Sequence, residues 1–211
     1  MADQNTRGAN AWEGTPTQER ILARAGELFH QFGFKRVTMD DIAHQQGMSK
    51  KTLYQHIPGK DALVEAFIER LMGQAIGAAR ELFRGGGDIV ETTSTMIPLI
   101  HSRLQSVSPV MMSDLQRHWP HLWDRINARR MAVLNLYLGQ LEEAKAQGLL
   151  RDEVNPKVMV RVIQAVVQEV AIPKTILELE VPVGDVLKTF MTIVMRGALS
   201  DDAQRRFEEG P

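Results

Sequence analysis

Residues 38–60, TMDDIAHQQGMSKKTLYQHIPGK, constrain the fold most strongly, because helix-start and helix-stop signals alternate within this short stretch. Thr38 suits a helix N-cap, and the two aspartates that follow lie where the helix dipole favours negative charge. Gly47 can adopt the positive φ that ends a helix, and Ser49 can cap the next one. The stretch therefore predicts two short helices joined by a tight turn.

The second of these helices has an apolar inner side and a polar outer side. Leu53 and Ile57 lie about one turn apart, so both can be buried against the rest of the module. The outer side then carries Lys50, Lys51, Thr52, Tyr54, Gln55 and His56. This arrangement predicts a helix-turn-helix that presents its second helix to DNA. The alternative is an ordinary helical hairpin whose lysines are merely solvated.

Charge is distributed unevenly along the chain. The 211 residues carry a net charge of −1, yet residues 17–60 contain seven Lys or Arg and only four Asp or Glu. A basic N-terminal module on an acidic remainder favours nucleic-acid binding through one end of the molecule. The charge imbalance is small, so it supports the DNA-binding interpretation of the motif but would be weak evidence alone.

Other features narrow the class of protein. The chain has no cysteine, which excludes disulfides, thiolate metal sites and a cysteine nucleophile. Its 44% hydrophobic content is that of a globular protein, and no apolar run approaches the ~20 residues of a membrane span. Residues 1–15 are polar, so we expect a flexible tail and no signal peptide. The expected location is the cytoplasm.

The whole chain has the periodicity of helices, which predicts an all-α fold of about nine helices. A first helix opens near Thr15 or Thr17 and ends at Gly33, and a longer one runs from Lys60 to about Phe83. Beyond the glycine-rich loop at 85–87, the predicted helices are 89–105, 109–118, 120–147, 156–178 and 183–199. We expect a helix-turn-helix domain at 16–62 and a helical regulatory and dimerisation domain at 63–211.

The last two predicted helices are apolar around well over half of their circumference. Such a helix must be buried on two sides, one of which can be a partner chain. Two helices from each chain would form a four-helix interface with two-fold symmetry. The predicted interface residues are Val162, Val166, Val170, Leu187, Phe190 and Val194. The alternative is that both helices are simply central core helices.

A small-molecule pocket, if present, should lie between the helices of 89–178. The segment 111–123 is rich in adaptable Met and flat Trp side chains, although these also suit an ordinary core. Gln164 and Gln168 are polar positions on an otherwise apolar helix, which makes them candidates for buried hydrogen-bonding groups; the alternative is that they are polar positions on the dimer interface. The candidate pocket residues are His101, Met111, Leu115, Trp119, Trp123, Gln164 and Gln168.

A metal site or an acid-base enzyme is the rival hypothesis. Asp114, His118 and His121 have spacings of four and three, which could gather metal ligands. Pro120 lies between the histidines and is expected to bend the chain there. An enzyme would also need a nucleophile or a cofactor motif, and the sequence contains neither. We therefore expect no catalytic residue, no metal and no cofactor.

The N-terminal residues resemble those of TetR/AcrR-family transcriptional regulators. The resemblance rests on Phe29 to Phe34 (FHQFGF), on the T-x-x-x-I-A start at Thr38, on GMSKKTLYQH, and on Lys60 with Ala62 and Leu63 after it. One departure is Ile57, where the family usually has Phe. The remaining 150 or so residues resemble the family only in length and helical pattern.

The resemblance implies a homodimer that binds palindromic operator DNA and responds to an unknown small-molecule effector. The implied DNA-binding residues are Thr38, Ser49, Lys50, Lys51, Thr52, Tyr54, His56 and Lys60. Their chemistry agrees, since Tyr54, His56 and Lys60 suit phosphates while residues 50–52 can reach base edges. Repression relieved by the ligand is the leading expectation, and activation is a variant of it.

Overall fold

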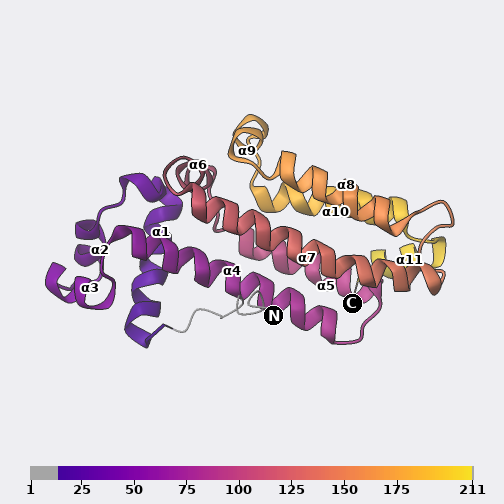
Figure 1. The fold of residues 1–211 in the computed structure, drawn as a ribbon, viewed down its shortest axis with the longest axis horizontal. Helices are drawn as coiled ribbons and strands as arrows, with labels where there is room; N and C mark the ends of the chain where they lie inside the picture. Colours follow the sequence, from indigo (N-terminus) through magenta and orange to yellow (C-terminus); the bar gives the residue numbers. More distant parts are fainter. Residues whose placement is uncertain (1–13, 211) are drawn as a thin grey trace, which may run out of the picture.

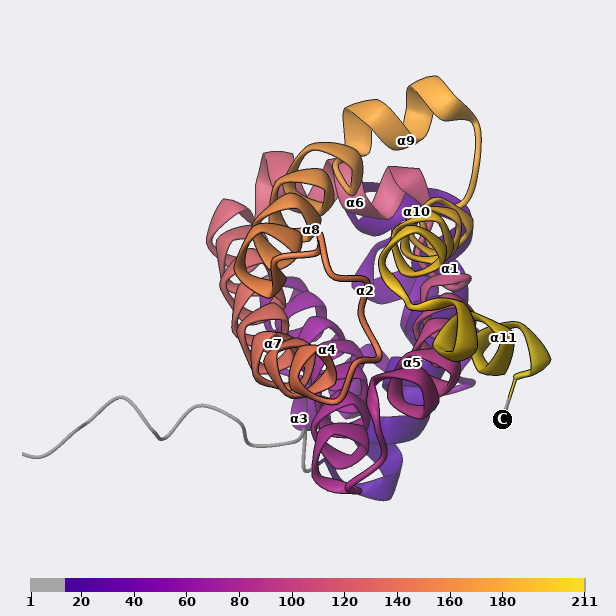
Figure 2. The same cartoon turned by 90° about the vertical axis from the view of Figure 1, so that its right-hand side faces the viewer.

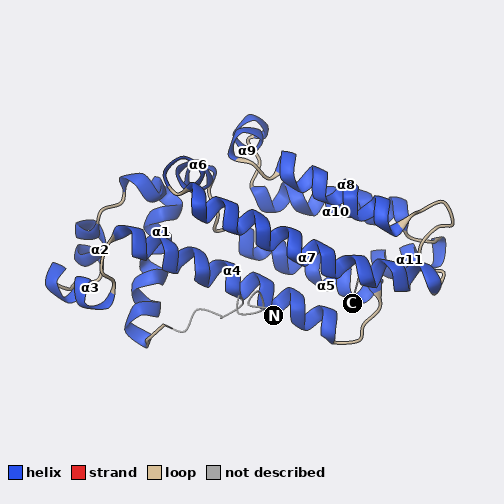
Figure 3. Cartoon of the chain, in the orientation of Figure 1, coloured by secondary structure: helices blue, strands red, loops and turns tan. Residues whose placement is uncertain are grey.

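The computed structural model describes residues 14–210, except for the side chains of residues 75, 76, 80 and 84. The tail predicted at 1–15 therefore lies almost entirely outside the described residues. Within them the chain forms eleven helices (Figure 3). The described residues also contain an isolated β-bridge, between Leu150 and Leu199. The helices are α1 (Pro16–Arg36), α2 (Met39–Gln45), α3 (Lys50–His56), α4 (Lys60–Arg84), α5 (Ile89–Leu104), α6 (Pro109–His118), α7 (Pro120–Ala146), α8 (Pro156–Val170), α9 (Pro173–Leu179), α10 (Val183–Ala198) and α11 (Asp201–Glu209).

The predicted all-α class is confirmed, but two helices were missed. The helix predicted at 156–178 is interrupted at Ala171 and Ile172, and Ile172 is extended because the proline that follows disfavours helical geometry there. α11 escaped prediction because it is strongly polar and buries only Ala203 completely. Its amphipathic signal is too short to stand out in the sequence.

Gly33 sets the angle at which α1 meets the rest of the molecule. Its φ of 78° lies in the left-handed region and breaks the regular path of α1 where the sequence predicted an end. A Cβ at this position would lie 2.5 Å from the Asp114 carboxylate on α6. Glycine is thus required both by the backbone and by the close approach of α6.

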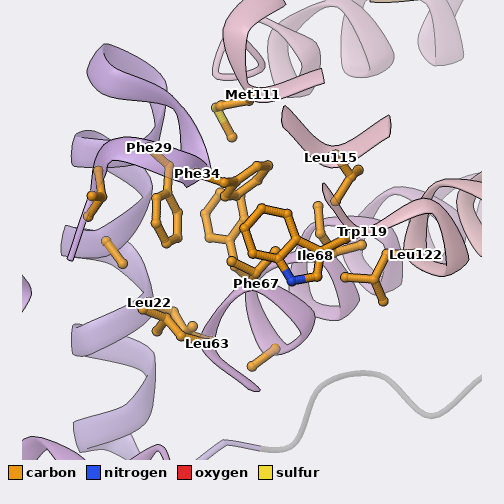
Figure 4. Packing of buried hydrophobic residues seen from close by; sticks show 14 of the residues in the cluster. Leu22, Phe29, Phe34, Leu63, Phe67, Ile68, Met111, Leu115, Trp119 and Leu122 are labelled. Atoms are coloured by element: carbon orange, nitrogen blue, oxygen red, sulfur yellow. The ribbon is translucent and has the colours of Figure 1, made fainter. Parts of the chain in front are cut away.

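A single hydrophobic core joins the N-terminal helices to α4, α6 and α7. Four aromatic rings form its centre, and Figure 4 shows them facing one another from three separate segments. Phe34 lies 4.7 Å from Phe29, 5.9 Å from Phe67 and 6.1 Å from Trp119, measured between ring centroids. The small N-terminal module is therefore stabilised by packing against the longer helices, as its size required.

Helices α4 to α11 form an elongated bundle, and α4 and α7 run along its length. The N-terminal helices α1–α3 lie at one end of this bundle (Figure 1). Seen from the other end, α8 packs along α7 and α10 packs along α5 (Figure 2). A second buried cluster, which includes Ile89, Tyr137, Leu141 and Met195, holds this end together. None of the described helices is long and apolar enough to cross a membrane.

Candidate functional site

Side-chain caps fix the start of both short helices of the N-terminal module. The Thr38 hydroxyl accepts from the backbone N–H of Asp41 at 3.2 Å, and the Asp41 carboxylate accepts from the backbone N–H of Thr38 at 2.8 Å. The Thr38 hydroxyl also donates to the Asp41 carboxylate at 2.7 Å, and this bond, together with the one from the Thr38 backbone N–H, holds the pKa of Asp41 below its ordinary value. Ser49 caps α3 by accepting from the backbone N–H of Thr52 at 3.1 Å. Gly47 makes the turn between them with a φ of 63°.

α3 has one buried side and one exposed side, as the sequence predicted. Leu53 is fully buried and Ile57 is nearly so, which anchors the helix on the module. Lys50, Lys51 and Tyr54 are exposed on the outer side, and 47% of Tyr54 is accessible. Lys50 is paired with Asp40 at 2.6 Å, while both groups remain largely exposed to solvent.

Other predicted DNA-binding residues also have roles inside the module. The Thr52 hydroxyl lies 2.8 Å from the Ser49 hydroxyl, and the backbone carbonyl of His56 accepts from Gln18 at 2.9 Å. The Lys60 ammonium donates to the carbonyl of Lys35 at 2.7 Å, at the end of α1. Desolvation, together with the nearby charge of Lys35, lowers the pKa of Lys60. Lys60 therefore ties α4 to α1 and keeps two further N–H donors.

Polar contacts accompany the aromatic core between the module and the bundle. The Asp114 carboxylate accepts from the backbone N–H of Lys35 at 2.7 Å. The Trp119 indole donates to Asp61 at 2.9 Å. Further along, Arg125 pairs with Glu65 at 2.8 Å. The first residues of α4, the end of α1 and helices α6 and α7 are thus held as one unit.

An apolar cavity of about 200 Å³ lies in the bundle between α4, α5, α7, α8 and α10. Its wall includes Met72 and Phe83 from α4, Met96 from α5, and Met191 from α10. Tyr137 is also part of the lining, and its hydroxyl is satisfied by Thr93 at 2.6 Å. Burial raises the pKa of Tyr137, so this phenol stays neutral.

None of the residues named as pocket candidates from the sequence lines this cavity. Met111, Leu115, Trp119 and Trp123 are buried in the aromatic core beside the N-terminal module. The sequence could not separate these two locations, because Met and Trp suit a core and a pocket equally.

The polar pocket candidates link helices to one another. His101 lies 2.7 Å from Asp185 and connects α5 to α10. Gln164 is buried and donates to Asn135 at 3.0 Å, which connects α8 to α7. Gln168 is exposed and contacts the sulfur of Met131 at 3.6 Å. Gln164 is thus a buried hydrogen-bonding group of the kind the sequence suggested, directed at a neighbouring helix.

The cavity also contains cations that sequence reasoning did not select. Arg129, Arg130 and Lys188 are part of its lining. Arg129 is paired with Glu69 of α4 at 2.7 Å. The sequence does show two adjacent arginines in the middle of α7, followed by an apolar stretch, and this pattern could have indicated cations beside an apolar cavity.

The predicted interface residues divide between exposed and partly buried positions. Val162 on α8 is 49% exposed, and Val166 and Val170 are half-buried. On α10, Leu187 lines the cavity, whereas Phe190 and Val194 pack against the second core cluster. The most exposed apolar side chains of the two helices are Val158, Val162 and Ile193.

The residues of the metal hypothesis are engaged separately. Asp114 accepts from the backbone of Lys35, and the His118 ring lies edge-on to Trp119. His121 is exposed on the first turn of α7. In the part of the chain that the structure describes, no three His, Asp or Glu residues gather as metal ligands.

A capped helix-turn-helix with an exposed polar second helix, on a helical bundle with an apolar cavity, is typical of DNA-binding transcriptional regulators. Residues 21–67 match the family model of "Bacterial regulatory proteins, tetR family". YvaF of Bacillus subtilis, an uncharacterised HTH-type transcriptional regulator, is 26% identical over 185 residues, covering 87% of this chain and 96% of that protein. The HTH-type transcriptional repressor KstR2 of Rhodococcus jostii is 24% identical and covers 85% of this chain and 90% of its own.

Solved structures agree on the fold. FadR from Bacillus subtilis, solved in complex with stearoyl-CoA, has a TM-score of 0.62 at 19% identity, covering 85% of this chain and 98% of that one. The match at residues 21–67 thus identifies the helix-turn-helix as one of the tetR type, and the relatives that span most of the chain are HTH-type transcriptional regulators. The matched family model and these relatives are transcriptional regulators, not enzymes, which speaks against the enzymatic alternative built on Asp114, His118 and His121.

Proposed function

We propose that this chain is a repressor that binds a palindromic operator as a homodimer and leaves it when a small molecule binds. The observation that carries the proposal is the outer face of α3, where Lys51 and Tyr54 are exposed on a helix whose start and inner side are fixed. A preorganised helix can enter a major groove without further ordering. Binding requires only that its side chains meet phosphates and base edges.

The proposed contacts follow from position on the module. Lys50, Lys51 and Thr52 lie in the first turn of α3, the end that reaches base edges in helix-turn-helix proteins. Tyr54, His56 and Lys60 suit phosphates. Thr38 and Ser49 contribute mainly by capping, because their hydroxyls already accept backbone N–H groups.

We propose that α8 and α10 pair two chains. Val158, Val162 and Ile193 are between 49% and 65% exposed, which is unfavourable for apolar side chains unless a partner covers them. A two-fold axis at this face would present two copies of α3 to one duplex. The copies must lie about 34–36 Å apart, or a multiple of this, to enter successive major grooves.

The proposed effector site is the cavity, and α4 is the proposed link to DNA. α4 contributes Met72, Ala79 and Phe83 to the cavity and begins at Lys60 beside the reading module. A ligand that shifts α4 would change the separation of the two reading helices. The relatives support this assignment, since KstR2 is named a repressor and FadR was solved with an acyl thioester.

The domain division proposed here is 16–62 for DNA binding and 63–211 for regulation and pairing. The helix α4 and the aromatic core cross this boundary, so the two parts are packed together. We place the protein in the cytoplasm, where a bacterial chromosome is accessible, and assign it no cofactor.

The test is a titration of purified protein against the DNA upstream of its own gene, with scrambled duplex as the control. We expect tighter binding to one sequence and a steep decrease in affinity with rising salt. Equal affinity for both duplexes at every salt concentration would contradict the proposal. Transcription from the same fragment in vitro distinguishes repression from activation.

A further inference from the structure

The cavity combines an apolar wall with charges of a single sign. Among the residues whose side chains the structure describes, its charged lining residues are Arg129, Arg130 and Lys188, and none is acidic. Arg129 is neutralised by Glu69 at 2.7 Å. Of these three cations, Arg130 and Lys188 are therefore the two that are not paired with Glu69.

Arg130 is a cation with poor compensation. Its guanidinium donates a hydrogen bond to the neutral side chain of Asn127 at 3.3 Å and lies 5.6 Å from the centre of the Trp123 ring. Among the described residues, no carboxylate lies within 4 Å of it. Desolvation lowers the pKa of Arg130 to about 10, so it remains charged at neutral pH. A partly desolvated cation of this kind favours an anionic neighbour.

Lys188 lines the same cavity from a different helix. It is exposed on α10 and also lines the cavity, whereas Arg130 lies on α7. An anion held by a planar guanidinium can make two parallel hydrogen bonds, and a flexible ammonium can reach it as a point charge. The rest of the lining is mainly aliphatic and methionine side chains, which adapt to apolar groups of varied shape.

We propose that the cavity binds an amphipathic organic anion, with an apolar chain or ring inside and one carboxylate or phosphate on Arg130 and Lys188. This inference rests on the proposed function for the role of the cavity as an effector site. The volume of about 200 Å³ is below the ~300–1,000 Å³ of typical ligand pockets, which favours a ligand of modest size.

The test is isothermal titration calorimetry on the full-length protein without DNA, using decanoate, decyl phosphate and 1-decanol below their aggregation limits. We expect the better anion to bind about tenfold to a hundredfold more tightly than the alcohol of equal chain length, since charge-assisted hydrogen bonds account for the difference. The comparison of decanoate with decyl phosphate identifies the headgroup. Equal affinity for all three probes would overturn the proposal.

Variants identify the anchoring residues. Arg130→Met keeps an unbranched side chain and should remove most of the preference for anions, while the exposed Lys188→Met should reduce it without endangering the fold. Arg117→Met, an exposed arginine of α6 away from the cavity, is the matched control and should change nothing. An unchanged preference in both cavity variants would contradict the assignment.

The outcome is separable from that of the proposed function. Anions that bind in the cavity but do not release operator DNA would support the anion site and contradict its effector role. Release of the operator by the alcohol alone, with no anion preference, would support the effector role and overturn the anion site.

Discussion

Replacing Phe34 by alanine tests whether the aromatic core holds the DNA-binding module on the bundle. Phe34 is 1% exposed, and its ring contacts Phe29, Phe67 and Trp119. Removing a buried phenylalanine costs about 3–5 kcal/mol, because the transfer free energy is lost and a cavity remains. For a chain of this length, each kcal/mol lowers the melting temperature by about 2–4 °C, so a decrease of about 6–20 °C is expected.

Phe32 provides the matched control on the same helix. It is 38% exposed, so its replacement by alanine removes only part of a buried contact and should cost about 1–2 kcal/mol, clearly less than Phe34→Ala. Both variants are compared with wild type at one protein concentration, by thermal unfolding followed by circular dichroism and by tryptophan fluorescence. Because Trp119 lies in the core, both probes should report the same decrease for Phe34→Ala. Similar decreases for the two variants would refute the reasoning.

Three further predictions concern binding, pH and the ion pairs of α4. Lys60→Ala should weaken binding to all duplexes alike and lower the salt slope by roughly one, whereas Lys51→Ala should change sequence preference in competition assays. Asp88→Ala should lower the free energy of unfolding by about 1 kcal/mol at neutral pH, as measured by urea unfolding. Desolvation raises the pKa of the Asp88 carboxyl, but the hydrogen bond from Arg206 and the capping hydrogen bonds outweigh it, so this pKa is lower in the folded protein than its ordinary value. The difference between variant and wild type should therefore shrink below pH ~4. Glu69→Gln should lower the free energy of unfolding by about 1–2 kcal/mol. This value lies between the contribution of an exposed ion pair and the cost of breaking a buried one.

The pH prediction follows from the direction of the pKa shift. Asp88 has a lower pKa in the folded state than in the unfolded chain, so the unfolded state binds more protons as the medium becomes acidic. Its contribution is complete well above the unfolded value and disappears as pH falls through the folded pKa. An Asp88→Ala deficit that stayed constant down to pH 3 would contradict the assignment.

The N-terminal module could be predicted from the sequence because its determinants are local. Thr38 and Ser49 cap helices that begin at the next residue, and Gly47 turns the chain between them. The burial of Leu53 and Ile57 also follows from helical spacing alone. Such signals require no knowledge of distant parts of the chain.

The cavity could not be predicted because it depends on contacts between distant helices. Arg130 looks in the sequence like any solvated arginine, and only the arrangement of α4, α5, α8 and α10 around α7 places it at an apolar cavity. Trp119 and Trp123 were considered as pocket residues for the same reason. Their spacing showed that they share a buried face without showing which segment covers it.

The break between α8 and α9 was a different kind of miss. Pro173 disfavours helical geometry at the residue before it, yet the apolar periodicity on both sides predicts one continuous helix. The structure follows the local rule, since the residue before the proline is extended.

The pairing of two reading modules is the central claim, and the stoichiometry on operator DNA tests it most directly. Sedimentation of the protein with a duplex containing one palindromic site should give two chains per duplex, and a duplex with a single half-site should bind far more weakly. Val162→Asp, a charge on the exposed face of α8, should yield a monomer in solution and lose this complex. One chain bound per palindrome with full affinity would contradict the account.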